Sequence, residues 1–204
     1  MKKSHFLTIP LLAAALIGCS DTPTTETKPQ VKAPPEPVSG LSALAKMFQV
    51  ARAWSGDVQV LKMNSILLSE VKQVPGKAAA WEATFASPSK GAQKSWTFSI
   101  IEAAGNLHEG VFGAGEAPWT ADAATPSFLI SAAKKDTDEA YKTALAAAAD
   151  HAKKNEGKPI SFLLETSKRF PNAVWRVVWG ESLGTSGLSV LVDATTGEYL
   201  ETLH

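Results

Sequence analysis

Cysteine is almost absent from this sequence of 204 residues, in which Cys19 is the only one. A lone cysteine excludes an intramolecular disulfide bond. An excess of charge of one sign is absent as well, because 20 lysine and arginine residues balance 20 aspartate and glutamate residues. Without a basic surplus, the composition gives no reason to expect a nucleic-acid partner. The rest of the composition, with 45% hydrophobic residues, fits one globular domain or two small ones.

Histidine is scarce too, and its positions do not mark a metal site. His108, His151 and His204 lack a second histidine, a cysteine or a carboxylate at a recognised metal-ligand spacing. We therefore expect these three histidines to be surface or packing residues. The sequence predicts neither a metal nor a cofactor.

The N-terminus differs in kind from the rest of the chain. Lys2 and Lys3 precede an apolar run from Phe6 to Ile17, which is too short to span a bilayer and is typical of a secretory signal peptide. Leu16-Ile17-Gly18-Cys19 resembles the bacterial lipobox. This resemblance implies that Cys19 receives a diacylglyceryl group and becomes the N-terminus after cleavage behind Gly18. The alternative is a plain signal peptide with an incidental cysteine.

The lipobox divides the N-terminal region into residues 1–18, a signal peptide, and residues 19–39, a lipidated cysteine with a tether. Several acyl chains, such as palmitate, would anchor the protein stably. The tether contains five prolines and few large apolar residues, so we expect it to be extended and disordered, with a structured extension as the alternative. Ser20 follows the cysteine and Asp21 comes one place later, a pattern that favours the periplasmic side of the outer membrane over the inner membrane by resemblance to other lipoproteins.

The first folded part is predicted to span residues 40–126. Apolar residues at helical spacing predict a helix that begins after Ser39, which can cap it, and that stops at Ser55-Gly56. Alternating apolar residues predict strands over 80–85 and 95–100, with a further strand over 106–112. Residues 113–126 are rich in glycine, alanine and proline and are predicted to connect two halves of the chain.

The second folded part is predicted to span residues 127–204. It opens with a short strand over 127–131, and Asp136 with Glu139 then resembles a capping box that begins a helix reaching Lys154. A strand follows over 159–167. The next strands are expected over 174–179, 188–192 and 198–200, forming an antiparallel meander.

The two halves match element for element. The helix residues correspond at an offset of 97 positions, and the strand residues correspond at offsets of 94 and 92. A helix and three or four antiparallel strands bury their apolar faces only when the helix lies across the sheet. The sequence thus predicts an α+β fold of two tandem two-layer units, each a helix packed on a 3–4-stranded antiparallel sheet. Chance similarity is the alternative, and edge-to-edge and face-to-face packing of the units both stay open.

Three segments of the second half carry a family likeness. Asp138-Glu139-Ala140 opens the helix, Val174-Trp175-Arg176-Val177 forms a strand, and a segment from Leu191 to Glu198 closes the sheet. Together they resemble a PepSY domain. The resemblance implies a small extracytoplasmic module without catalytic residues, found in peptidase propeptides and envelope proteins, that restrains peptidases or binds other envelope proteins.

No constellation for catalysis emerges from the sequence. The serines lack a nucleophile elbow, and the glycines from Gly110 to Gly115 lack the strand-glycine-helix context of a nucleotide site, so we expect a flexible loop there. Asp193 is expected to bond the backbone amides of a turn rather than act as a catalytic carboxylate. Cys19 would be consumed by lipid. The chain is therefore predicted not to be an enzyme.

Six tryptophans are many for a chain of this length. Four of them occupy alternating strand positions and are predicted to be core residues: Trp81, Trp96, Trp175 and Trp179. Trp54 lies at a helix end and Trp119 in the predicted connection. We single out Trp119 as a candidate partner-binding residue.

These patterns lead to one main functional expectation. We expect a non-catalytic, lipid-anchored envelope protein that binds another protein or peptide, with a peptidase as one candidate partner. One alternative is a structural or assembly subunit of an envelope complex. A second alternative is a hydrolase with an unrecognised site.

Overall fold

The computed structural model describes residues 35–204. The predicted signal peptide, the lipidation site at Cys19 and most of the predicted tether lie outside these residues. Within the described part, no helix combines the length and apolarity that a bilayer crossing requires.

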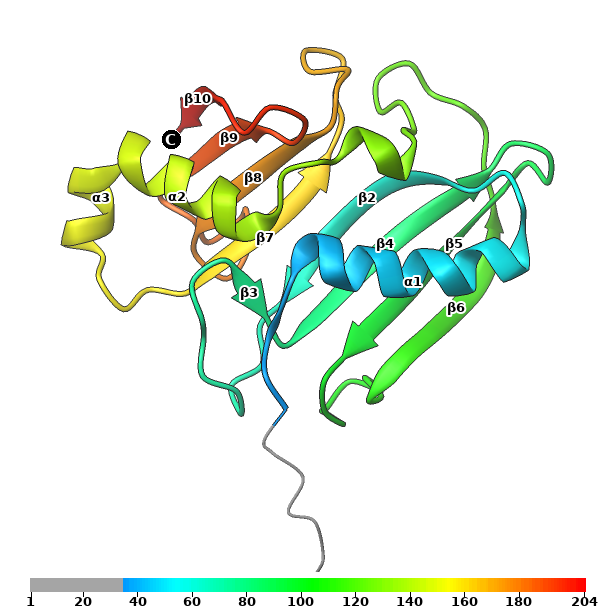
Figure 1. The fold of residues 1–204 in the computed structure, drawn as a ribbon, viewed down its shortest axis with the longest axis horizontal. Coiled ribbons are helices and arrows are strands. Elements are labelled where there is room, and N and C mark those ends of the chain that lie inside the picture. Colours follow the sequence, from blue (N-terminus) through cyan, green and yellow to red (C-terminus); the bar gives the residue numbers. More distant parts are fainter. Residues whose placement is uncertain (1–34) are drawn as a thin grey trace, which may run out of the picture. The chain divides into compact units, whose positions relative to one another are not determined.

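One antiparallel sheet of eight strands organises the described chain, in the order β10-β9-β8-β7-β2-β4-β5-β6 (Figure 1). The strands are β2 (Gln59–Ile66), β4 (Ala80–Ser87), β5 (Ala92–Ser99), β6 (Gly110–Pro118), β7 (Ile160–Glu165), β8 (Val174–Trp179), β9 (Ser189–Asp193) and β10 (Tyr199–Leu203). Two short strands, β1 (Val38–Ser39) and β3 (Lys77–Ala78), pair apart from this sheet. The α+β class and the antiparallel pairing are as the sequence predicts.

The two halves of the chain share this sheet edge to edge. Strands β2, β4, β5 and β6 form one side, and β7 to β10 form the other as a four-stranded meander. The two sides meet where β2 pairs with β7, at Met63–Leu164 and Asn64–Leu163. Face-to-face packing, which the sequence left open, is not what this chain adopts.

Two helices cover the same face of the sheet (Figure 1). Helix α1 (Gly40–Trp54) packs on β4 and β5, and helix α2 (Thr137–Ala147) packs on β8 and β9. The predicted second helix is interrupted at Ala148, whose backbone is not helical, and continues as α3 (Ala149–Lys154). The predicted short strand over 127–131 is wrong, because this segment holds an isolated bridge at Phe128 and a 3-10 helix, η1 (Ile130–Ala132).

The core lies between the helices and the sheet. The residues that alternate along the strands point into it, and Trp81, Trp175, Phe85 and Phe162 are fully buried there. Removing about 200 Å² of an aromatic side chain from water contributes roughly 5 kcal/mol before ordering entropy is subtracted. Trp96 and Trp179 are 2% and 3% exposed, so all four tryptophans predicted to be core residues are buried.

The N-termini of α1 and α2 meet in the middle of the sheet, and a single carboxylate serves both. Asp136 is the N-cap of α2 and accepts a hydrogen bond from the Thr137 N–H at 2.7 Å. The same carboxylate accepts from the Leu41 N–H in the first turn of α1 at 2.9 Å and from the Ser39 hydroxyl at 2.6 Å. The predicted cap of α1, Ser39, makes no cap bond of its own, because Asp136 provides that bond. The predicted capping-box partner Glu139 instead pairs with Lys135 at 2.9 Å.

This junction leaves no room for a side chain at Gly40. The Gly40 N–H donates to the Thr137 hydroxyl at 2.8 Å. A Cβ at Gly40 would lie 2.6 Å from Trp175 Cη2 and 2.7 Å from Thr137 Cγ2. Glycine therefore lets the two helices approach over the buried Trp175 ring.

The segment after β5 differs most from the sequence prediction. We expected a strand that ends at Phe112 and a flexible glycine loop over 110–115, but β6 runs from Gly110 to Pro118. A bulge between its pairings to Lys94 and Trp96 accommodates an extra residue. A Cβ at Gly113 would lie 2.9 Å from the Trp96 Nε1 atom, so this glycine makes room for the indole ring. The glycines from Gly110 to Gly115 are strand residues rather than loop residues.

Candidate interaction surface

The predicted partner-binding residue, Trp119, lies directly after β6. It is partly exposed, and its backbone N–H donates to the Gly91 carbonyl at 2.8 Å. This bond extends the β5–β6 pairing by one residue. Trp119 thus stands at the end of the edge strand of the sheet. The other predicted site residue, Cys19, lies outside the described residues.

The histidines are placed apart from one another. His108 pairs with Glu102 at 3.0 Å and packs against Phe112, with the two rings tilted and their centroids 4.8 Å apart. His151 lies edge-on to Trp179 at 6.0 Å. Among residues 35–204, no group of three or more His, Cys, Asp or Glu side chains could hold a metal ion.

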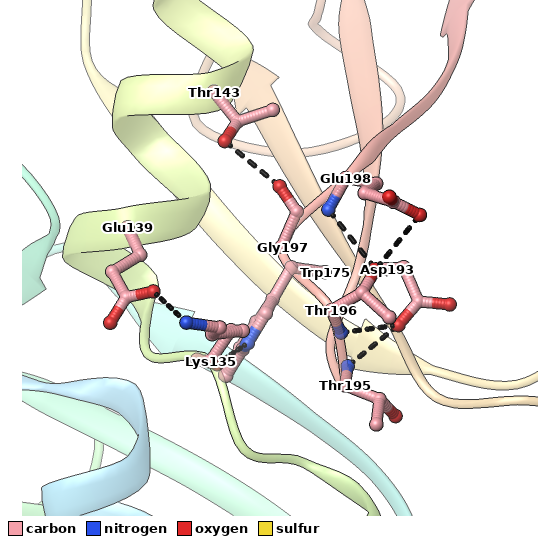
Figure 2. Close-up of polar contacts among 9 residues, drawn as sticks. All are labelled: Lys135, Glu139, Thr143, Trp175, Asp193, Thr195, Thr196, Gly197 and Glu198. Carbon is pink, nitrogen blue, oxygen red and sulfur yellow. Dashed lines mark hydrogen bonds and ion pairs between the residues drawn. The ribbon is translucent and has the colours of Figure 1, made fainter.

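Asp193 forms the turn that its sequence context predicts. Its Oδ1 atom accepts from the Thr195 N–H at 2.7 Å and from the Thr196 N–H at 2.9 Å (Figure 2). Gly197 closes the turn with a left-handed backbone, at φ 82°. The carboxylate is therefore engaged in holding β9 and β10 in register.

This turn is fastened to α2 and to the segment that precedes it. The Thr143 hydroxyl donates to the Gly197 carbonyl at 3.0 Å, and the Trp175 indole N–H donates to the Lys135 carbonyl at 2.7 Å (Figure 2). The Lys134 and Lys135 N–H groups both donate to the Ala194 carbonyl at 2.8 Å. These bonds give the Asp-to-Gly motif a structural role in the second half.

The Asp57 carboxylate accepts hydrogen bonds from three serines between the end of α1 and the β4–β5 hairpin. Its carboxylate accepts from the Ser55 hydroxyl at 2.6 Å, the Ser87 hydroxyl at 2.7 Å and the Ser89 N–H at 2.7 Å. The hydrogen bonds from Ser55, Ser87 and Ser89 hold the pKa of Asp57 well below its usual range. This arrangement ties the end of α1 to the β4–β5 hairpin.

Strand β6 is the exposed edge of the sheet on the side of the first half. Its residues from Phe112 to Pro118 are exposed, and five of its side chains are glycine or alanine: Gly110, Gly113, Ala114, Gly115 and Ala117. Phe112 is 47% exposed and points to the face away from the helices, because it pairs with Thr97 rather than with Trp96 or Phe98. Small side chains leave the backbone of an edge strand open to another chain.

The direction of the β6 backbone groups follows from the Trp119–Gly91 bond. Along a strand, the N–H and C=O groups of successive residues point alternately to the two sides. The backbone N–H of Trp119 points toward β5, so the backbone N–H and C=O groups of Ala117 also point toward β5. The backbone groups of Pro118 and Glu116 point away from β5. Pro118, which has no N–H, fits an outward position. Glu116 therefore presents its N–H and C=O to the outside of the sheet.

The opposite edge, β10, is better protected. It has five residues, it is interrupted by a bulge between Tyr199 and Glu201, and Arg169 pairs with Glu201 at 2.9 Å. Short length, bulges and charged side chains are devices that prevent an edge strand from pairing with another chain. The two edges of this sheet therefore differ in how readily they accept a further strand.

A groove of about 370 Å³ lies along the β2–β7 junction, beside the loop at Leu183. Its lining includes Leu163 and Leu183 together with Lys62, Glu165 and Glu181. Acidic and basic groups are mixed in it, so the groove has no strong preference for one charge.

Sequence reasoning singled out Trp119 and predicted a strand over 106–112, but it did not predict that the strand continues to Pro118 at the edge of the sheet. Glycine and alanine are poor strand formers, so the composition of β6 favours a loop when it is considered alone. Two signals pointed to a strand: the Gly105-Asn106 turn after β5 and the Val111-Phe112 pair.

No protein-family model matches the chain, and no curated protein sequence matches it. One solved structure that aligns with it is the crystal structure of a "putative lipoprotein" from Clostridium difficile 630, with 7% sequence identity and a TM-score of 0.46. The alignment covers 79% of this chain and 91% of that chain. A similarity of this size carries no argument about function.

Proposed function

We propose that this chain is a non-catalytic, lipid-anchored protein of the bacterial cell envelope that binds another protein or peptide. The observation that carries the binding function is the long, uncovered edge strand β6. The lipid anchor rests on the Leu16-Ile17-Gly18-Cys19 sequence, with Cys19 as the acylated residue. Ser20 after the cysteine supports attachment to the outer membrane, facing the periplasm.

We further propose that the chain holds two tandem PepSY-like units. Hydrogen bonds between residues 97 positions apart support this proposal, since 97 is the offset at which the two helices match in sequence. They join Ser39 to Asp136, Gly40 to Thr137, and Ser65 to Phe162. When a two-fold axis relates two units, equivalent residues meet at that axis. The strand order, which runs outward from β2 and β7 in the same sequence on both sides, fits the same symmetry.

The packing supports a binding role over a catalytic one. Asp57 and Asp193, carboxylates in hydrogen-bonded clusters, are both occupied by hydroxyl or backbone donors within the protein. The exposed features of β6 are its backbone edge and the Phe112 ring, which suit contact with another polypeptide. A peptidase acting in trans is one candidate partner.

In-cell photo-crosslinking tests the proposal on the full lipidated chain. A photoreactive phenylalanine analogue would replace Trp119, Ala117 or Leu183 in turn, and Lys153 on α3 would serve as a control position. We expect adducts with a distinct envelope protein from the first group and not from Lys153. If none of the positions yields an adduct above the level of the control, the binding function is wrong.

A further inference from the structure

We propose that β6 takes up an extended segment of another polypeptide as a ninth strand of the sheet, with a large apolar side chain of that segment beside Phe112. This inference rests on the proposed binding function and names the kind of partner that the site accepts. The partner is recognised mainly through its backbone. A folded surface or a small molecule would not satisfy the row of backbone groups along the edge.

The edge is long enough for strand addition. β6 has 9 residues, whereas β10 has 5 and carries a bulge and an ion pair. Exposed edges in native proteins are usually protected, since they otherwise pair with other chains. On β6 the only ionised side chain is Glu116, and it is turned back to the Trp54 indole at 2.6 Å. The strand therefore lacks charge protection along the backbone from Val111 to Gly115.

Phe112 supplies the side-chain part of the recognition. It lies on the helix-free face, and His108 packs on one side of its ring at 4.8 Å. A neighbouring strand would place every second side chain on this face, within reach of the ring. β-Branched or aromatic residues at that position would gain the most, because aromatic cross-strand pairs contribute more than small ones.

A second copy of this chain is a poor occupant of the β6 edge. Two β6 strands paired with each other would place glycine and alanine opposite glycine and alanine over most of their length. Such a pairing gains backbone hydrogen bonds but few cross-strand side-chain contacts. A partner with larger side chains gains both.

A synthetic peptide tests strand addition directly. The probe has the length of β6, 9 residues, with alternating threonine and valine and one central phenylalanine; the control peptide carries prolines at alternate positions. Amide hydrogen exchange is measured on the full-length lipidated protein in detergent micelles. We expect the probe, and not the control, to slow exchange in residues 110–117 by about tenfold or more, because new backbone hydrogen bonds protect amides. Exchange in β10 should not change.

A matched pair of variants tests the outward backbone groups. Glu116→Pro removes the outward N–H, whereas Glu116→Ala keeps it, and both variants lose the hydrogen bond to Trp54. Because Glu116 points away from β5, proline costs no bond within the sheet. We expect E116P to bind the probe at least about tenfold more weakly than E116A does, which corresponds to about 1.4 kcal/mol. Phe112→Thr, at a half-exposed position, should also weaken binding of the phenylalanine probe. If E116P does not fold, the affinity of F112T for the probe tests the inference instead.

Several outcomes would overturn the inference. Unchanged exchange over 110–117 at about 1 mM probe, protection at β10 instead, or equal affinities of E116P and E116A would each exclude strand addition at β6. A dimer of the full chain in sedimentation experiments that E116P abolishes would identify a second copy as the occupant. If Leu183 gives photo-crosslinks to a partner while Trp119 and Ala117 give none, strand addition at β6 is wrong while the proposed binding function stands.

Discussion

Replacing Asp136 by alanine should destabilise the starts of both helices at once. The carboxylate accepts from backbone N–H groups at the first turns of α1 and α2 and from the Ser39 hydroxyl, at 2.6 to 2.9 Å. It also lies at the positive ends of two helix dipoles. Alanine would leave the Leu41 and Thr137 N–H groups without this acceptor in a half-buried junction.

The magnitude follows from the number of bonds that are lost. Removing one N-cap side chain costs about 0.5–2 kcal/mol, and a hydrogen bond to a charged group contributes about 1.5–3 kcal/mol. Ser39 can turn toward α1 and replace one bond, which reduces the loss. We expect a decrease of about 3 kcal/mol in the free energy of unfolding, or about 6–12 °C in Tm for a folded unit of this size.

Thermal and urea unfolding, followed by tryptophan fluorescence, measure this effect. Asp138→Ala is the matched control, because Asp138 also lies in the first turn of α2 and has no cap bond in the structure. It should cost less than about 1 kcal/mol. Asp136→Asn, which keeps one acceptor oxygen, should fall between the two. If D136A and D138A unfold within about 2 °C of each other, the shared cap contributes little and the reasoning is refuted.

Three further predictions follow from other parts of the chain. Gly40→Ala should destabilise the protein by about 2–3 kcal/mol, because its methyl group would clash with Trp175, while Gly56→Ala, which has open space around it, should be nearly neutral in the same unfolding assay. Asp57→Asn should lower Tm at pH 7. Because folding lowers the pKa of Asp57, the extra stability of the wild type is fully present above the unfolded pKa of about 3.9 and is lost as pH falls below it. The Tm values of the wild type and the variant should therefore converge in acid. Cys19→Ser should abolish lipid labelling and move the protein out of the membrane fraction; labelled protein in this variant would contradict lipidation at Cys19.

Local patterns predicted much of the fold. The alternation of Trp175, Val177 and Trp179 was enough to place β8, because burial of every second residue is a property of the strand itself. Helix α1 began and ended where capping and stop signals predicted. The Asp193 turn formed as expected, since an aspartate bonds the next amides without help from distant residues.

The candidate site was harder to predict because it depends on neighbours rather than on composition. β6 is strand because β5 offers it a partner, and Gly113 is tolerated there because the Trp96 ring needs the space. Whether an edge is open depends on what covers it, and this is decided by the order of the strands. The sequence of residues 110–118 alone shows neither the pairing with β5 nor the order of the strands.

The sequence by itself determined the α+β class, the positions of most helices and strands, the buried tryptophans and the lipobox-like N-terminus, because each depends on residues close together in the chain. Only the tertiary structure decided that the halves join through β2 and β7 into one sheet, that Asp136 caps two helices, and that β6 is left as an exposed edge. These features arise from contacts between residues far apart in sequence, such as Ser39 and Asp136. Spacing along the chain does not encode which distant groups will meet.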